Sequence, residues 1–210
     1  MIHPSALVET EQIGEETNVW AFAHVMQGAR IGAQVNIGDH AFVEGGAVIG
    51  DRVTLKNRVC VWEGITIESD VFVGPCVTFT NDKHPRSPRM ERVRARYSSR
   101  QGWLVPTLVR RGCSIGAAAT ICPGIELGAY SMIGAGSVVT KNVPPFALVC
   151  GSPATHVADV CSCGQKLAGL FDQAACAHCG ETPQERLSIL RACNQTNGAT
   201  DVPPPGRVKS

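Results

Sequence analysis

Hydrophobic residues recur at every sixth position over most of this chain. A helix would also place hydrophobic residues three and four positions apart, and an ordinary strand would alternate at every second residue. A six-residue period is typical of a parallel β-helix, here one whose coils have three flat walls. The pattern therefore predicts an all-β solenoid over residues 1–157. The residues that set the period are Leu7, Ile13, Val19, Val25, Ile31, Ile37, Val43, Ile49, Leu55, Val61, Ile67, Val73 and Phe79, followed by Val109, Ile115, Ile121, Leu127, Ile133 and Val139.

A second set of small or β-branched residues lies four positions after the first, for example Val35, Ala41 and Val53. Both sets are predicted to point into the core. Because three hexads make one coil, residues in equivalent positions of successive coils should stack on one wall about 4.8 Å apart. Glycine often follows the periodic residue, as at Gly32 and Gly116, where we expect it to let the backbone turn a corner at which a Cβ would clash.

The period stops between Phe79 and Val109, which predicts an inserted loop over residues 80–108. Residues 82–100 carry seven positive and two negative side chains, a net charge of +5 in a chain whose total is +1. Long loops in compact domains are uncommon and usually functional. We expect an arm that meets phosphate groups. The alternative is a solvated, mobile loop.

The overall composition suggests neither nucleic acid nor a membrane as a partner. The net charge of +1 gives no bulk attraction to polyanions. No apolar stretch is long enough to span a bilayer and no signal peptide is recognised, so a soluble, cytoplasmic protein is expected. In that setting the ten cysteines are interpreted as reduced thiols or metal ligands.

Four cysteines lie in two short motifs after the periodic region. They form Cys161-Ser-Cys163-Gly and Cys176-Ala-His178-Cys179-Gly. Tetrahedral zinc sites use two such pairs, each followed by a glycine turn. The spacing predicts a zinc knuckle over residues 158–182, although the first pair is more closely spaced than usual; the alternative is four reduced thiols in a flexible tail. Residues 183–210 are predicted to form a short helix and, from Asn194, a disordered tail.

The segment Ile115–Pro145, with Ile133-Gly-Ala-Gly-Ser-Val-Val-Thr-Lys-Asn-Val-Pro144, resembles the hexapeptide-repeat acetyltransferases, left-handed β-helix enzymes that use acetyl-CoA. Four further segments resemble the members that N-acetylate nucleotide-linked 3-amino sugars, such as UDP-2-acetamido-3-amino-2,3-dideoxy-glucuronate, for bacterial surface polysaccharides including O-antigen. These are His3-Pro-Ser-Ala6, Val19-Trp-Ala-Phe-Ala-His24, Val61-Trp-Glu-Gly64 and Phe79-Thr-Asn-Asp-Lys-His-Pro-Arg-Ser87. The resemblance implies a homotrimer in which acceptor and acetyl-CoA share a groove between neighbouring subunits.

The candidate acceptor residues cluster around the start of the insertion. Glu63 and Asn81 are separated by three hexads, so they should stack on one wall and could hold an amino group and its neighbouring hydroxyls. The resemblance implies that Asn81 contacts the sugar amine. His84 either acts as a base or positions the acceptor, and Arg86 belongs to the phosphate-binding arm. His24, on an early coil, either grips the acceptor's nucleotide or only packs in the wall.

The candidate acetyl-CoA residues lie on the later coils. Backbone amides near Ala117, Gly134 and Ala135 could stabilise the thioester oxyanion, because small residues let the pantetheine arm approach closely. Lys141 could meet a CoA phosphate, with Pro144 and Pro145 beside the adenine. The alternative is that these residues serve only coil packing.

Three other functions share parts of this pattern. An O-acetyltransferase acting on a sugar or serine hydroxyl would need His84 as an essential base. A non-catalytic member would serve as an interaction subunit through its zinc tail. A zinc carbonic anhydrase of this fold would need a closely spaced histidine pair, which the six histidines do not provide. We favour direct acetyl transfer to an amine without an acyl-enzyme.

Overall fold

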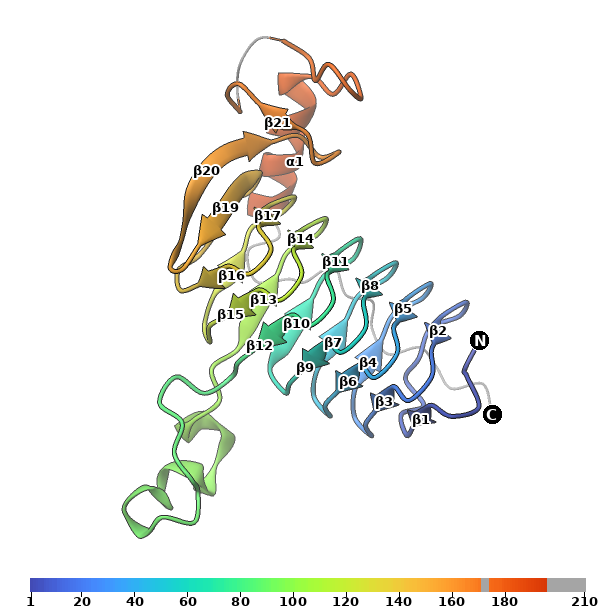
Figure 1. Ribbon diagram of the computed structural model, residues 1–210, viewed down its shortest axis with the longest axis vertical. Coiled ribbons are helices and arrows are strands. Elements are labelled where there is room, and N and C mark those ends of the chain that lie inside the picture. The colour runs from blue at the N-terminus through green and yellow to red at the C-terminus, as the bar shows by residue number, and fades with distance from the viewer. Residues whose placement is uncertain (171–173, 196–210) are drawn as a thin grey trace.

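The computed structural model describes residues 1–170 and 174–195. Short parallel strands stack into three flat walls, which confirms the predicted parallel β-helix (Figure 1). Wall A holds β2 (Asn18–Val19), β5 (Asn36–Ile37), β8 (Thr54–Leu55), β11 (Phe72–Val73), β14 (Ser114–Ile115) and β17 (Met132–Ile133). Wall B holds β1 (Leu7–Val8), β3 (His24–Val25), β6 (Phe42–Val43), β9 (Cys60–Val61), β12 (Thr78–Phe79), β15 (Thr120–Ile121) and β18 (Val138–Val139). Wall C holds β4 (Arg30–Ile31), β7 (Val48–Ile49), β10 (Ile65–Ile67), β13 (Thr107–Val109) and β16 (Glu126–Leu127).

The core is a narrow column of the two residue sets that were predicted to point inward. Val43 pairs with Val25 below it and Val61 above it, which are its counterparts on the preceding and following coils. The periodic residues and the small residues four positions later are almost all fully buried, as at Ile37 and Ala41. Repeated packing of similar side chains along the axis is how a solenoid buries apolar surface without a broad core.

The corners between walls differ from the prediction in one respect. The residue that adopts positive φ lies three positions after the periodic residue, as at Gln34 (φ 57°), Arg52 (φ 55°) and Tyr130 (φ 56°). The glycines directly after the periodic residue have a different purpose. A Cβ on Gly116 would lie 2.5 Å from the backbone nitrogen of Ala135 on the next coil. Glycine there permits close stacking of coils, and the turn itself is made two positions later.

The basic insertion leaves the stack between β12 and β13 (Figure 1). Phe79 pairs with Ile121 on the next coil, which is much further along the chain than the three hexads that separate partners elsewhere. The additional segment forms an arm, residues 80–106, that contains η1 (Glu91–Val93), η2 (Arg96–Ser98) and η3 (Arg100–Gly102). An isolated bridge between Asp82 and Leu104 closes its base.

A small extension follows the last coil and continues wall A, first with a strand parallel to β17 and then with antiparallel strands. It comprises β19 (Ala147–Gly151), β20 (Ala154–Val160), β21 (Lys166–Leu167) and α1 (Pro183–Gln195). The helix begins with a capping box in which Thr182 Oγ1 accepts the Glu185 N–H, while the Glu185 carboxylate accepts the Thr182 N–H. The predicted disordered tail is corrected at Asn194 and Gln195, which belong to α1; its remainder lies outside the described residues. Among the described helices, none has the length and apolar character needed to cross a membrane.

Candidate functional site

The acceptor candidates Glu63 and Asn81 stack as expected, but at the corner between walls B and C, where the arm begins, and not on the flat of a wall. The Asn81 side chain donates a hydrogen bond to the Glu63 carbonyl oxygen at 3.2 Å, as their separation by one coil indicated. The Glu63 carboxylate is half-buried and forms an ion pair with Arg100 of the arm at 2.6 Å. Its backbone N–H is held by the Glu44 carboxylate on the preceding coil. This corner therefore presents a fixed amide and a carboxylate whose cation partner, Arg100, is exposed.

Asp82 orders the base of the arm. It accepts hydrogen bonds from the Tyr97 hydroxyl at 2.7 Å and the His84 N–H at 2.9 Å, and it pairs with the Arg96 guanidinium. Burial alone would raise the pKa of Asp82, but the bonds from Tyr97, His84 and Arg96 outweigh it and lower the pKa. Arg96 also donates to the His84 carbonyl oxygen. The roles of Asp82, Arg96 and Tyr97 were not predicted from the sequence. Asp82 lies 14 residues before Arg96 and 15 before Tyr97, and the six-residue period relates neither pair.

His84 is fixed through its backbone while its side chain is exposed. Lys83 and the arginines of the arm at positions 86, 89, 92 and 94 are exposed as well, and none of them forms an ion pair within the described ranges 1–170 and 174–195. The arm therefore presents several exposed cations. In the described part of one protomer, no acidic side chain pairs with the imidazole of His84 to orient it.

The outer face of wall B carries a line of rings that leads to the acceptor corner. His24 meets Phe42 edge-on with centroids 5.4 Å apart, and Phe42 meets Trp62 at the same distance. His24 Nε2 lies 3.4 Å from the Glu9 carboxylate. The Trp62 indole N–H donates to the Phe79 carbonyl oxygen. Phe42 was not singled out from the sequence, although its outward position one coil after His24 was a usable signal.

The acetyl-CoA candidates are divided between two corners. Ala117 and Ala135 stack at the corner between walls A and B, and no described hydrogen bond uses either N–H. Gly134 is a correction, because its N–H donates to Val149 O at 2.8 Å and cannot serve an oxyanion. Lys141 is exposed at the corner between walls B and C, above Asn81 and across wall B from Ala135. One protomer therefore does not bring the predicted acetyl-CoA residues together.

A shallow polar pocket of about 250 Å³ lies lower on the corner between walls A and B. Its lining includes Trp20, Asn36, Lys56 and Asn57. The Trp20 indole N–H donates to Asn36 Oδ1 at 2.8 Å, which fixes the ring while leaving it 38% exposed. The pocket and the two alanine amides thus share one edge of the prism.

The four cysteines of the two C-terminal motifs come together. Their sulfur atoms all lie within 4.8 Å of one another, so the group could hold a metal ion. The backbone N–H groups of Cys179 and His178 lower the pKa of the Cys176 thiol to about 6, whereas burial raises that of Cys161. His178 is not part of the cluster.

The three-walled coil, the six-residue period and the loop at a coil corner define the hexapeptide-repeat transferases, and residues 106–141 match the family model "Bacterial transferase hexapeptide (six repeats)". The chain belongs to this family and is an acetyltransferase, which confirms the resemblance. It is 44% identical over 180 residues to dTDP-3-amino-3,6-dideoxy-α-D-galactopyranose 3-N-acetyltransferase of Aneurinibacillus thermoaerophilus, covering 86% of this chain and 88% of the relative.

Other relatives match shorter parts of the chain. A serine acetyltransferase of Buchnera aphidicola is 35% identical over half of this chain and about a third of its own length. Among solved structures, the acetyltransferase domain of PglB from Neisseria gonorrhoeae in complex with acetyl coenzyme A aligns with a TM-score of 0.46 and 19% identity. That alignment covers 74% of this chain and 56% of the PglB chain.

Proposed function

We propose that this protein transfers the acetyl group of acetyl-CoA to the amino group of a nucleotide-linked amino sugar, with dTDP-linked 3-amino sugars as the first candidates. The proposed substrate class rests on one observation. The relative named for that reaction matches at 44% identity along 88% of its own length. The acceptor corner supports the proposal, since Asn81 and the Glu63 carboxylate are suited to an amine.

The complete site is proposed to form between two subunits of a homotrimer. In one protomer the Asn81 corner and the Ala117 and Ala135 amides lie on opposite edges of wall B. A flat wall offers no deep concave pocket, whereas two adjacent prisms enclose a groove. We therefore assign the acceptor edge of one protomer and the donor edge of its neighbour to the same groove, with Lys141 beside a CoA phosphate.

In the proposed reaction the neutral amine attacks the thioester carbonyl directly. The C–N bond forms, the carbonyl oxygen becomes an oxyanion, and the C–S bond then breaks with CoA thiolate as the leaving group. The Ala117 and Ala135 N–H groups are proposed as oxyanion donors. The proton of the new ammonium passes to the departing thiolate, whose thiol has a pKa of about 8.5. His84 then positions the acceptor instead of acting as an obligatory base.

The arm is assigned to the acceptor's diphosphate. Its arginines at positions 86, 89, 92 and 94 are exposed and carry no ion pair in the described part of the chain. Guanidinium groups bind phosphate oxygens in pairs, which suits a nucleoside diphosphate better than a neutral acceptor. An acetylated nucleotide sugar is a donor for a glycosyltransferase, so we place the product in surface-polysaccharide synthesis.

The test is a thiol-release assay with acetyl-CoA and a panel of acceptors: dTDP-, UDP- and GDP-linked amino sugars, a galactoside and serine. We expect turnover with a nucleotide-linked amine and none with the hydroxyl acceptors. Asn81→Ala should lose nearly all activity, and His84→Ala should lose less than about tenfold, compared with the roughly 10²–10⁴-fold that a general base contributes. Transfer to serine or galactoside that His84→Ala abolishes would establish the O-acetyltransferase instead.

A further inference from the structure

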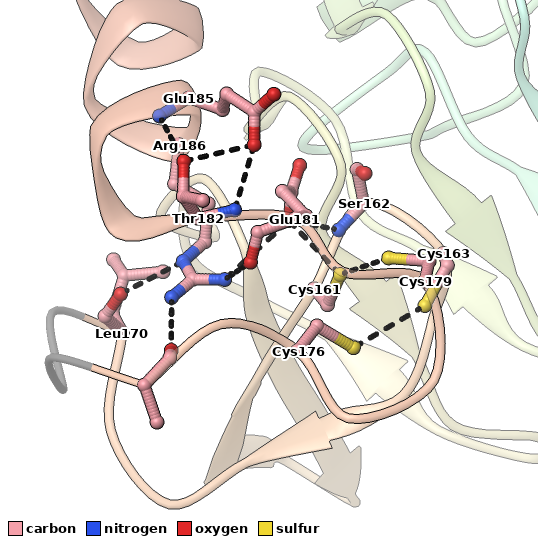
Figure 2. A network of polar contacts seen from close by, with 11 residues as sticks. Cys161, Ser162, Cys163, Leu170, Cys176, Cys179, Glu181, Thr182, Glu185 and Arg186 are labelled. Atoms are coloured by element: carbon pink, nitrogen blue, oxygen red, sulfur yellow. Dashed lines mark hydrogen bonds and ion pairs between the residues drawn. The ribbon is translucent and has the colours of Figure 1, made fainter.

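Each of the two cysteine motifs forms a turn closed by the N–H of its glycine, over three residues in the first motif and over four in the second. In the first, the Gly164 N–H donates to Cys161 O at 2.8 Å, and in the second, the Gly180 N–H donates to Cys176 O at the same distance. Both glycines have positive φ, at 86° and 79°, which a side chain would strain. Figure 2 shows how these turns direct the four cysteines toward one another, beside the start of α1.

The sulfur positions fit one metal ion better than two disulfide bonds. Cys161 Sγ lies 3.3 Å from Cys179 Sγ, and Cys163 Sγ lies 3.8 Å from Cys176 Sγ. A tetrahedral Zn²⁺ with Zn–S bonds of about 2.3 Å places its four sulfurs about 3.8 Å apart. Disulfides would instead draw the sulfurs into two separate pairs at about 2.05 Å. Each sulfur here is near all three others, within 4.8 Å.

The described part of the extension beyond residue 157 has little apolar core that could otherwise hold it together. Among the described side chains from position 158 onward, the buried apolar ones are Val160, Cys161, Cys176 and Pro183. Two of these four are thiols of the cluster. A unit this small rarely folds on hydrophobic burial alone and usually needs a disulfide or a metal.

A polar network connects the cluster to the helix. Glu181 Oε2 accepts the Ser162 N–H at 3.1 Å and lies 2.9 Å from Cys161 Sγ, so it touches the first turn while following the second in sequence. The guanidinium of Arg186, on α1, is fully buried and donates to the carbonyl oxygens of Leu170 and Glu181. Through Glu181 and Arg186, polar contacts therefore connect the cysteine turns to α1 (Figure 2).

We propose that Cys161, Cys163, Cys176 and Cys179 bind one structural Zn²⁺ that staples β20, β21 and α1 into a folded extension on the end of the β-helix. The ion takes all four thiolates, so it has no open position for substrate and its role is structural. Loading releases the protons of those thiols that are still protonated. The proposal is independent of the acetyl-transfer reaction and goes beyond it.

The first measurement is metal content by mass spectrometry of the full chain, purified without chelator. We expect about one zinc per chain in the wild type, as for a closed four-cysteine site. The double variant Cys163→Ala/Cys179→Ala loses the two exposed ligands without opening a core cavity. Its zinc content should fall below about 0.2 per chain. Cys76→Ala, an exposed cysteine elsewhere, should keep its zinc. Wild-type zinc below about 0.2, iron in its place, or an intact mass showing two disulfides would overturn the site.

The second measurement tests the staple. Trypsin should cut at Lys166 and Arg191, both exposed in the extension, at least about tenfold faster in the zinc-free double variant, because local unfolding exposes the backbone. The β-helix should stay intact in both proteins, so a change confined to these two sites separates local release from global unfolding. Equal cleavage rates at these sites with and without zinc would refute the staple even if the ion binds.

Discussion

Removing the buried guanidinium of Arg110 should be among the most destabilising single changes in the β-helix. Arg110 follows β13 at the corner between walls C and A, and its side chain is 9% exposed. Its Nη1 donates to Glu68 Oε1 at 3.0 Å and its Nε to Glu126 Oε1 at 2.8 Å. The Glu68–Arg110 bond spans the coil interrupted by the arm, so it ties the coils on either side of the insertion together.

The expected loss of folding stability follows from how deeply the two carboxylate partners of Arg110 are buried. Glu68 is 7% exposed and Glu126 is 45% exposed. Taking one partner from a buried pair costs about 3–5 kcal/mol, whereas an exposed pair is worth about 0–1 kcal/mol. In the variant, Glu68 would still accept the hydrogen bond that the Arg111 backbone N–H donates to it at 2.9 Å. We therefore expect Arg110→Met to cost about 3 kcal/mol, roughly a 100-fold change in the unfolding equilibrium.

The assay is urea unfolding followed by circular dichroism at fixed protein concentration, since assembly shifts apparent stability by mass action. Glu126→Gln is the matched control and should cost less than about 1 kcal/mol. The double variant Glu68→Leu/Arg110→Met should recover much of the loss, because apolar replacement of both partners removes the buried charge. If Arg110→Met cost no more than Glu126→Gln, the reasoning would be refuted.

Three further predictions concern the corners, the arm and the core thiol. Gly116→Ala should cost about 1–3 kcal/mol by overpacking the coil above, whereas Gly136→Ala meets no atom within 4 Å and bears only the strain of φ 68°; equal losses in urea unfolding would contradict the close-stacking role. Asp82→Asn should speed tryptic cleavage of the arm at pH 7 without unfolding the β-helix. Because the folded-state pKa of Asp82 is lowered, its ordering effect is complete above pH 3.8 and fades as the pH falls further; an unchanged cleavage rate would exclude that role. Burial raises the pKa of Cys113 to about 12, so iodoacetamide at pH 8 should modify exposed Cys76 and leave Cys113 unmodified until urea unfolds the chain; early loss of Cys113 would show that it is accessible.

Much of the fold can be predicted from the six-residue period, because every coil buries residues at the same positions. Ile37 and Ala41 are buried for the same reason as every other pair in phase with them, and one rule therefore locates the core. The same rule brought Glu63 beside Asn81. The residue with positive φ was not predictable, since side chains as different as Phe22 and Arg52 occupy that corner position.

The structure of the arm could not be predicted from the sequence. The arm also obscured how the periodic residues before it, up to Phe79, align with those after it, from Val109. Its order depends on Asp82, Arg96 and Tyr97, which share no period. Counting hexads from Phe79 straight through the insertion would place Val109 on wall A, because the gap between them is a whole number of hexads but not of coils. Val109 instead lies on wall C, paired with Ile67, since the arm makes no wall of its own.

With each hexad assigned to its correct wall, the proposed donor and acceptor residues lie on different edges of the prism. Lys141 comes one hexad after Ala135 and so lies one corner further on, with the whole of wall B between them. Asn81 lies on the same edge as Lys141, and the amides of Ala117 and Ala135 lie on the other. A rigid stack of close-packed coils cannot fold these edges together. The proposed transfer chemistry therefore requires a second copy of the chain, and a monomer that turned over at full rate would contradict the shared groove more directly than any single substitution.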